Sequence, residues 1–227
     1  NDSAQMATEI GIMQMFRQLS PGDSVVCVMP IKKFFLDMTG GPVPPDLDST
    51  LTLTYSFNVK EITEVQAYQE MQAKFADEKS AKQLQDDIAT IDKFLEEKGI
   101  EAVKLESGLR YVITKQGKGE NGKPGQTAKV NYAGYTLEGV YFDSNIKNVA
   151  QEKGFYNPQR EPYGAFEVAI DQSGVIKGWH EALKVMNVGS KGTFYIPSTL
   201  GWGPRRVSDV IKENQITVFD IEMLEVK

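Results

Sequence analysis

Residues 175–197 read VIKGWHEALKVMNVGSKGTFYIP, and this stretch decides the fold of the C-terminal half of the chain. A short helix fits 178–187, and the strand-like run 191–197 follows it. Further runs rich in β-branched and aromatic residues lie on both sides, at 109–115, 127–136, 165–170 and 215–226. Many strands around one short helix predict an α+β fold, in which an antiparallel β-sheet wraps around that helix.

The first 62 residues contain two more strand-like runs, 24–36 and 50–62. The cluster GGPVPP at 40–45 separates them, and such a cluster predicts a loop. An apolar stretch at 10–19 precedes the first run. These features predict a small N-terminal unit at 1–62.

Residues 63–98 contain neither Gly nor Pro, and their apolar side chains recur at helical spacing. The apolar phase slips across 76–82, so this segment is either two helices or one bent helix. Its acidic pairs, such as Asp86 with Asp87, are interpreted as a solvated helix face. The segment 63–104 is therefore expected to be a helical linker packed on a neighbouring domain or, alternatively, a dimerisation helix.

The composition narrows the classes of function. The chain carries 25 Lys and Arg against 31 Asp and Glu, for a net charge of -6. This argues against nucleic acid as a partner, because a phosphate-binding surface needs a basic excess. His180 is the only histidine, which argues against a multi-histidine metal site and a Ser-His-Asp triad; neither metal nor cofactor is expected. Cys27 is the only cysteine, so no intrachain disulfide forms.

Several motifs in the C-terminal half resemble those of the FK506-binding (FKBP) family of peptidyl-prolyl cis–trans isomerases, and they occur in family order. The resemblance implies an FKBP-type isomerase domain at 105–227. The motifs are ESGLRY at 106–111, VNYAGY at 130–135, VYFDS at 140–144, FEV at 166–168, VIKGW at 175–179 and VFDIEML at 218–224.

The resemblance also implies a substrate pocket. Its residue types describe an apolar dish with one carboxylate, suited to a proline ring and the side chain before it. The alternative is that they are plain core residues. Asp143 argues for a site, because a carboxylate among aromatic rings is destabilising unless it is hydrogen-bonded, and Tyr132 is its natural partner. The implied pocket consists of Tyr132, Phe142, Asp143, Phe166, Val175, Ile176, Trp179, Ile211 and Phe219.

Four residues carry the catalytic roles that the resemblance implies. The backbone N–H of Ile176 holds a substrate carbonyl, and Asp143 and Tyr132 orient and polarise the twisted imide. Trp202 stands where the family usually has a Tyr whose hydroxyl donates to the substrate. The indole N–H is also a donor, but it sits elsewhere on a larger ring, so a lower rate or an altered preference is expected.

An insertion at 145–164 joins the VYFDS motif to the next strand, where the family has a short connection. It resembles a longer version found in envelope proteins of the Bacteroidetes group. One hypothesis is a flap that adds contacts from Phe155, Tyr156 or Tyr163 to the pocket. The alternative is a surface loop pinned by its own aromatic residues.

The N-terminal region resembles part of the C-terminal one. Residues 16–30 align with 183–197, and 53–59 align with 217–223, with Ile12 where Trp179 stands. This internal repeat predicts a degenerate, partial FKBP-like domain without a catalytic pocket. If the missing strands of this domain are absent, its apolar strand edges need cover from the linker helix or from a second chain, and this need favours a homodimer.

The resemblance to the FKBP family implies an isomerase that assists the folding of proline-containing client polypeptides, and it alone suggests a bacterial cell envelope as the location. The macrolides tacrolimus and rapamycin are expected ligands. Two alternatives stay open: a catalytically weak peptide-binding module or holdase chaperone, and a structural dimer whose pocket is vestigial.

Overall fold

The structure is a computed structural model that describes residues 16–172 and 174–227. The chain divides into two compact units, residues 1–73 and 74–227. The second unit contains an antiparallel seven-stranded sheet in the order β3-β4-β8-β9-β5-β6, and β7 also pairs with β5. The strands are β3 (Val103–Lys104), β4 (Arg110–Lys115), β5 (Thr127–Thr136), β6 (Tyr141–Ser144), β7 (Phe166–Ala169), β8 (Lys191–Ile196) and β9 (Thr217–Val226).

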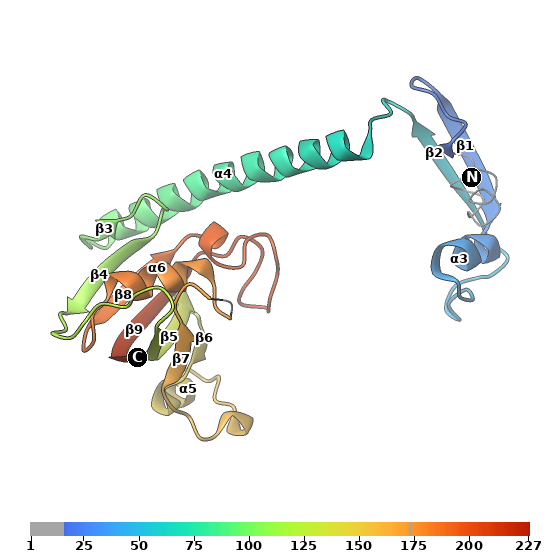
Figure 1. Cartoon of the computed structure of the whole chain (residues 1–227). Coiled ribbons are helices and arrows are strands. Elements are labelled where there is room, and N and C mark those ends of the chain that lie inside the picture. The colour runs from blue at the N-terminus through green and yellow to red at the C-terminus, as the bar shows by residue number, and fades with distance from the viewer. Residues whose placement is uncertain (1–15, 173) are drawn as a thin grey trace. The chain divides into compact units, whose positions relative to one another are not determined.

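Helix α6 (Lys177–Val185) packs across one face of this sheet (Figure 1). Its buried side chains, among them Trp179 and Leu183, join a core that includes Phe194 of β8 and Ile221 of β9. Gly178 allows the close approach of α6, because a Cβ at this position would lie 2.5 Å from the side chain of Ile196. The fold is therefore α+β, with an antiparallel sheet wrapped around a short helix, as predicted.

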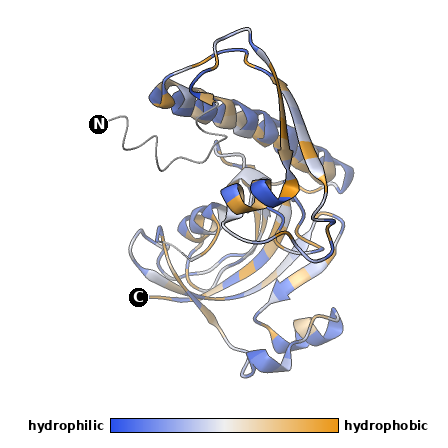
Figure 2. Ribbon diagram, turned by 90° about the vertical axis from the view of Figure 1, so that its right-hand side faces the viewer, coloured by the Kyte–Doolittle hydropathy of each residue, from blue (hydrophilic) through white to orange (hydrophobic). Residues whose placement is uncertain are grey.

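Helix α4 (Val65–Glu97) is one continuous helix rather than two segments, and its last turns cover the opposite face of the sheet. Ile91 and Leu95 pack against Tyr195 and Val218, which alternate along β8 and β9 with the residues that face α6. Most of α4 is hydrophilic, with single hydrophobic residues spaced along it (Figure 2). None of the helices in the described ranges combines the length and the apolar character needed to cross a membrane.

Two carboxylates on α4 tie its second half to the rest of unit 74–227. Asp92 accepts a hydrogen bond from Nε of the buried Arg110 at 2.8 Å. Asp87 accepts two from Ser198, at 2.6 and 2.7 Å, and is only 3% exposed. The interpretation of Asp87 as part of a solvated face is therefore wrong, although Asp86 is exposed as expected.

The described part of unit 1–73 is built on an antiparallel hairpin of β1 (Ser24–Pro30) and β2 (Thr52–Asn58). Helix α3 (Ile31–Thr39) lies between the two strands in sequence and ends at Gly40, which has the left-handed conformation (φ 69°). The strand expected over 24–36 is thus wrong beyond Pro30. Apolar residues at 31, 34, 35 and 38 follow helical spacing, and Pro30 is the last residue with extended backbone before the helix (ψ 139°).

The two hairpins of the chain share one register. Ser24 pairs with Asn58 in the first, and the aligned residues Lys191 and Glu222 pair in the second. At the other end, Met29 pairs with Leu53, as Ile196 pairs with Thr217. This agreement supports the alignment of the two regions, whereas their origin as a repeat stays a prediction. The comparison of Ile12 with Trp179 lies outside the described residues.

Candidate active site

A cavity of about 760 Å³ opens between the sheet and the start of α6. The structure brings all the predicted site residues together around it. They come from β5 (Tyr132), β6 (Phe142 and Asp143), β7 (Phe166), the start of α6 (Val175, Ile176 and Trp179), the segment after β8 (Trp202 and Ile211) and β9 (Phe219). Their individual roles remain predictions.

Aromatic rings packed edge to face form the floor of the cavity. Trp179 lies 4.9 Å from Tyr132 and 5.3 Å from Phe219, with interplanar angles of 81° and 83°. Phe142 meets Phe219 in the same way, at 5.6 Å. This geometry is favourable for aromatic pairs and holds each ring in one orientation. The floor is thus a rigid apolar seat.

Gly134 lies directly beneath two of these rings. It pairs with Phe219 of β9 and with Asp143 of β6 in the sheet. A Cβ at this position would lie 2.6 Å from the Phe219 ring and 2.8 Å from the Phe142 ring. The absence of a side chain at 134 therefore allows both rings to rest on the sheet.

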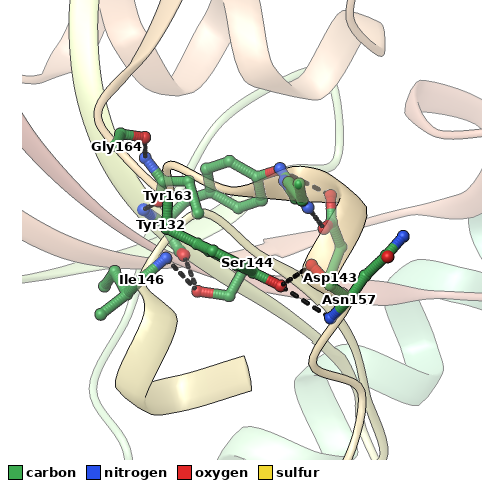
Figure 3. Close-up of polar contacts among 9 residues, drawn as sticks. Tyr132, Asp143, Ser144, Ile146, Asn157, Tyr163 and Gly164 are labelled. Carbon is green, nitrogen blue, oxygen red and sulfur yellow. Dashed lines mark hydrogen bonds and ion pairs between the residues drawn. The ribbon is translucent and has the colours of Figure 1, made fainter. Parts of the chain in front are cut away.

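A polar group stands at one edge of this apolar seat (Figure 3). The Tyr132 hydroxyl donates to Asp143 at 2.6 Å, and the two side chains point toward each other. The guanidinium of Arg160 donates to the same carboxylate and, at 2.9 Å, to the Tyr132 oxygen. Burial, reinforced by the bond to Asp143, raises the pKa of Tyr132 above its ordinary value of 10. Tyr132 is therefore a hydrogen-bond donor at neutral pH.

Ser144 and Asn145 hold the backbone around Tyr132, and Figure 3 shows Ser144 beside it. The Ser144 hydroxyl donates to the Tyr132 carbonyl at 2.5 Å. Asn145 accepts from the Tyr132 N–H at 2.7 Å and donates to the carbonyls of Val130 and Gly164. These bonds join β5 to both ends of the insertion, so the polar group and the insertion are positioned together.

The insertion contributes a cation to the site and no aromatic contact. It contains α5 (Lys147–Glu152) and the 3₁₀ turn η1 (Pro158–Arg160). Tyr156 stacks on Tyr163 at 5.6 Å, and neither they nor Phe155 line the cavity. The aromatic residues pin the segment to itself, which is the alternative that the sequence left open.

Sequence reasoning missed Arg160. The only available signal was the apolar setting predicted for Asp143, because a carboxylate there calls for a second donor. Lys177 and Arg205 also line the cavity and were not singled out.

The chemistry that this arrangement supports is desolvation and hydrogen bonding. Within the described residues, no three His, Cys, Asp or Glu side chains gather as ligands for a metal ion. The side chains can seat an apolar ring and donate hydrogen bonds to the carbonyl groups beside it.

Comparisons with known proteins agree with this geometry. Residues 118–224 match the family of FKBP-type peptidyl-prolyl cis-trans isomerases. A probable isomerase of this type from Haemophilus influenzae is 37% identical over 137 residues, which cover 60% of this chain and 50% of that protein. The probable isomerase FkpA of Neisseria meningitidis is 34% identical over 181 residues, covering 75% of this chain, with part of its N-terminal region, and 60% of that protein.

The outer membrane protein MIP of Legionella longbeachae is 35% identical over 125 residues, which cover 55% of this chain and 47% of that protein. The chain thus spans between half and three fifths of the length of the first two relatives. Residues 118–224 therefore form a domain of the FKBP-type peptidyl-prolyl cis-trans isomerase family.

Proposed function

We propose that this chain catalyses cis–trans isomerisation of X–Pro bonds in client polypeptides and so assists their folding. The observation that carries the proposal is the rigid aromatic cavity with the Tyr132–Asp143–Arg160 group at its edge. Unaided X–Pro bonds isomerise over tens to hundreds of seconds, which is slow enough to limit folding. The twisted transition state has lost the amide resonance that water stabilises, so an apolar seat penalises it less than the planar ground state.

The structure suggests how the chain holds the substrate. No described residue accepts a hydrogen bond from the Ile176 N–H, at the N-cap of α6, so this donor can hold a substrate carbonyl. Phe142, Trp179 and Phe219 seat the proline ring. Tyr132 and Asp143 orient the imide, and Arg160 acts as a positioning residue that holds both of them.

The test is cis–trans exchange of a short X–Pro peptide followed by NMR, with and without tacrolimus or rapamycin. Accelerated exchange that either macrolide blocks is the expected result. A chain that binds the peptide saturably without accelerating exchange would overturn the proposal. It would favour the alternative of a peptide-binding module or holdase, for which the specific observation is Trp202 in the place of the family's usual Tyr.

We further propose that residues 105–227 form the isomerase domain, 63–104 a helical connection, and 1–62 a degenerate partial copy that mediates homodimer formation. Val26 and Val28 on the open face of β1 are 66% and 62% exposed, which supports a protein contact there. The similarity to an outer membrane protein supports a cell-envelope location. Light scattering of the chain and of a Val26→Lys, Val28→Lys variant tests the dimer, which the variant should dissociate.

A further inference from the structure

Asp87 on α4 is a buried carboxylate with no cation beside it in the described structure. It accepts hydrogen bonds from neutral donors only: Gln83 Nε2 at 2.8 Å, and the backbone N–H and hydroxyl of Ser198. A buried charge without a counter-ion is destabilising unless its hydrogen bonds are well formed. The geometry of these bonds is therefore the feature that explains a carboxylate at this position.

Ser198 links Asp87 to the turn that carries Trp202. It is fully buried and begins the 3₁₀ turn η2 (Ser198–Leu200). On one side, its N–H and Oγ both donate to Oδ2 of Asp87, at 2.7 and 2.6 Å. On the other side, its carbonyl accepts from the N–H groups of Gly201 and Gly203, at 2.9 and 2.8 Å. These two glycines flank Trp202, so one residue joins the helix to both sides of the tryptophan.

Trp202 forms part of the cavity wall, and Asp87 does not reach the cavity. The indole lies 6.1 Å from the Phe142 ring in an edge-on arrangement. The turn is closed on its far side by the Asn214 N–H, which donates to the Gly203 carbonyl at 2.8 Å. The position of the indole thus depends on a short chain of hydrogen bonds that begins on α4.

We propose that Asp87 is a positioning residue that holds Trp202 in the wall of the substrate cavity. Helix α4 is then a structural part of the substrate site and more than a connection. The inference rests on the proposed function. Without the carboxylate, the N–H and hydroxyl of Ser198 lose their acceptor in a buried place, and the η2 turn has to shift to find other partners.

The experiment compares three variants of the full chain. Asp87→Leu keeps the branching of the side chain but removes every acceptor, whereas Asp87→Asn keeps one acceptor oxygen for Ser198. Asp92→Leu is the matched control, because it removes the other polar link of α4, to Arg110 and Lys104, without touching the Trp202 turn. The readouts are kcat and KM for an X–Pro peptide and the two indole N–H resonances in ¹H–¹⁵N NMR spectra, assigned with Trp202→Tyr.

For Asp87→Leu, we expect kcat/KM to fall about 10- to 100-fold, and the Trp202 indole resonance to move. Asp87→Asn should stay within about threefold of the unchanged chain, because a neutral acceptor still serves Ser198. Asp92→Leu should also lower the melting temperature, because it leaves the buried Arg110 without its carboxylate partner, but it should keep kcat/KM within about twofold. Equal losses of activity in the two leucine variants would overturn the proposal, because they would reflect general loosening of α4.

Two further measurements distinguish failure of the positioning role from misfolding of the variant and from failure of the proposed function. If Asp87→Leu does not fold, Ser198→Ala, which removes only the hydroxyl bond, should lower kcat/KM several-fold and move the same resonance. If the unchanged chain does not catalyse exchange, the proposed function fails. The positioning role is then read from the Trp202 resonance and from the Kd of the peptide. An unmoved resonance in Asp87→Leu would refute it in either case.

Discussion

The β1–β2 and β8–β9 hairpins pair their strands in the same register, yet only the second contributes to the aromatic cavity beside Tyr132 and Asp143. The buried pair Phe194 and Phe219 corresponds in register to Cys27 and Tyr55, which are both half-buried. Strand pairing therefore accounts for the hairpin and not for the site. The difference lies in what surrounds each hairpin.

Each strand of the second hairpin has a further neighbour in the sheet, β4 beside β8 and β5 beside β9. Helices α6 and α4 cover its two faces. In the described part of unit 1–73, the β1–β2 sheet has two strands only, and α3 packs on it through Phe34 and Tyr55. The neighbouring strands and the two covering helices therefore build the closed core, and the aromatic cavity lies within that core.

The largest effect on stability is expected when Phe194 is compared with Cys27, which occupies the equivalent position in the first hairpin. Phe194→Ala should lower the free energy of unfolding of unit 74–227 by about 3–5 kcal/mol, because it leaves a cavity in a closed core. Cys27→Ala should change the stability of unit 1–73 by less than about 1 kcal/mol. Urea titration followed by tryptophan fluorescence reports the first, since both tryptophans lie in unit 74–227, and circular dichroism reports the second. Similar losses would contradict the comparison.

A second prediction tests the polar group that β5 and β6 add beside the second hairpin. Asp143→Leu should lower kcat about 10- to 100-fold with a smaller change in peptide Kd, because in the proposed mechanism the carboxylate acts on the twisted imide more than on the bound ground state. Exchange spectroscopy at saturating peptide measures kcat. An unchanged rate would remove Asp143 from the mechanism.

A third prediction tests Arg160, which reaches Tyr132 and Asp143 from the insertion at 145–164. Arg160→Gln should lower kcat/KM about 3- to 10-fold, because Tyr132 and Asp143 lose a charged donor that holds them. Lys147→Gln is the control: it removes the exposed ion pair to Glu161 in the same insertion. Activity that falls equally in both variants would assign the effect to the insertion's structure.

The packing of α4 on the β8–β9 hairpin should contribute less to stability at acidic pH. The hydrogen bond from Arg110, opposed by burial and aided by Lys104, holds the pKa of Asp92 below its ordinary value of 3.8. The stabilisation is therefore complete above the pKa of the unfolded chain and is lost as the pH falls through the lower pKa of the folded state. In urea titrations between pH 6 and pH 3, Asp92→Asn should reduce the pH dependence by about 1 kcal/mol or less. An unaltered pH profile would contradict this assignment.

The smallest effect concerns the residue that departs from the family pattern. Trp202→Tyr should raise kcat/KM about two- to fivefold, because it restores a hydroxyl donor at the cavity wall. Trp202→Phe fills the same space without a donor and should bring no gain. If both substitutions raise the rate equally, ring size rather than hydrogen bonding limits the natural site.

The sequence predicted the secondary structure correctly where the hydrophobic pattern of a segment fits only the element that the tertiary structure contains. The run at 127–136 is β5, because it alternates and is bounded by turn signals. The run at 24–36 was predicted as one strand, which is wrong after Pro30. Apolar residues beyond Pro30 fit both strand and helix, and burial of Ile31 favours the helix. Short apolar runs do not resolve that choice by themselves.

The apolar lining of the site was also predictable, since its residues lie in recognisable motifs. Arg160 and Asp87 were not, because their partners are set by the path of the chain. Arg160 lies 17 residues after Asp143, and Asp87 lies 111 residues before Ser198. No local spacing connects such pairs, and a charged residue on a polar helix ordinarily indicates a solvated face.

Gly134 is a position at which a single substitution would alter the aromatic cavity during evolution. A Gly134→Ala substitution would keep the backbone N–H and C=O groups that pair with β6 and β9, but its methyl group would displace the rings of Phe142 and Phe219 in the cavity wall. A lineage that acquired this one substitution would keep the backbone pairing and lose the present shape of the aromatic cavity. Natural variation at position 134 would thus mark the branches in which the cavity no longer has the shape that the proposed catalysis requires.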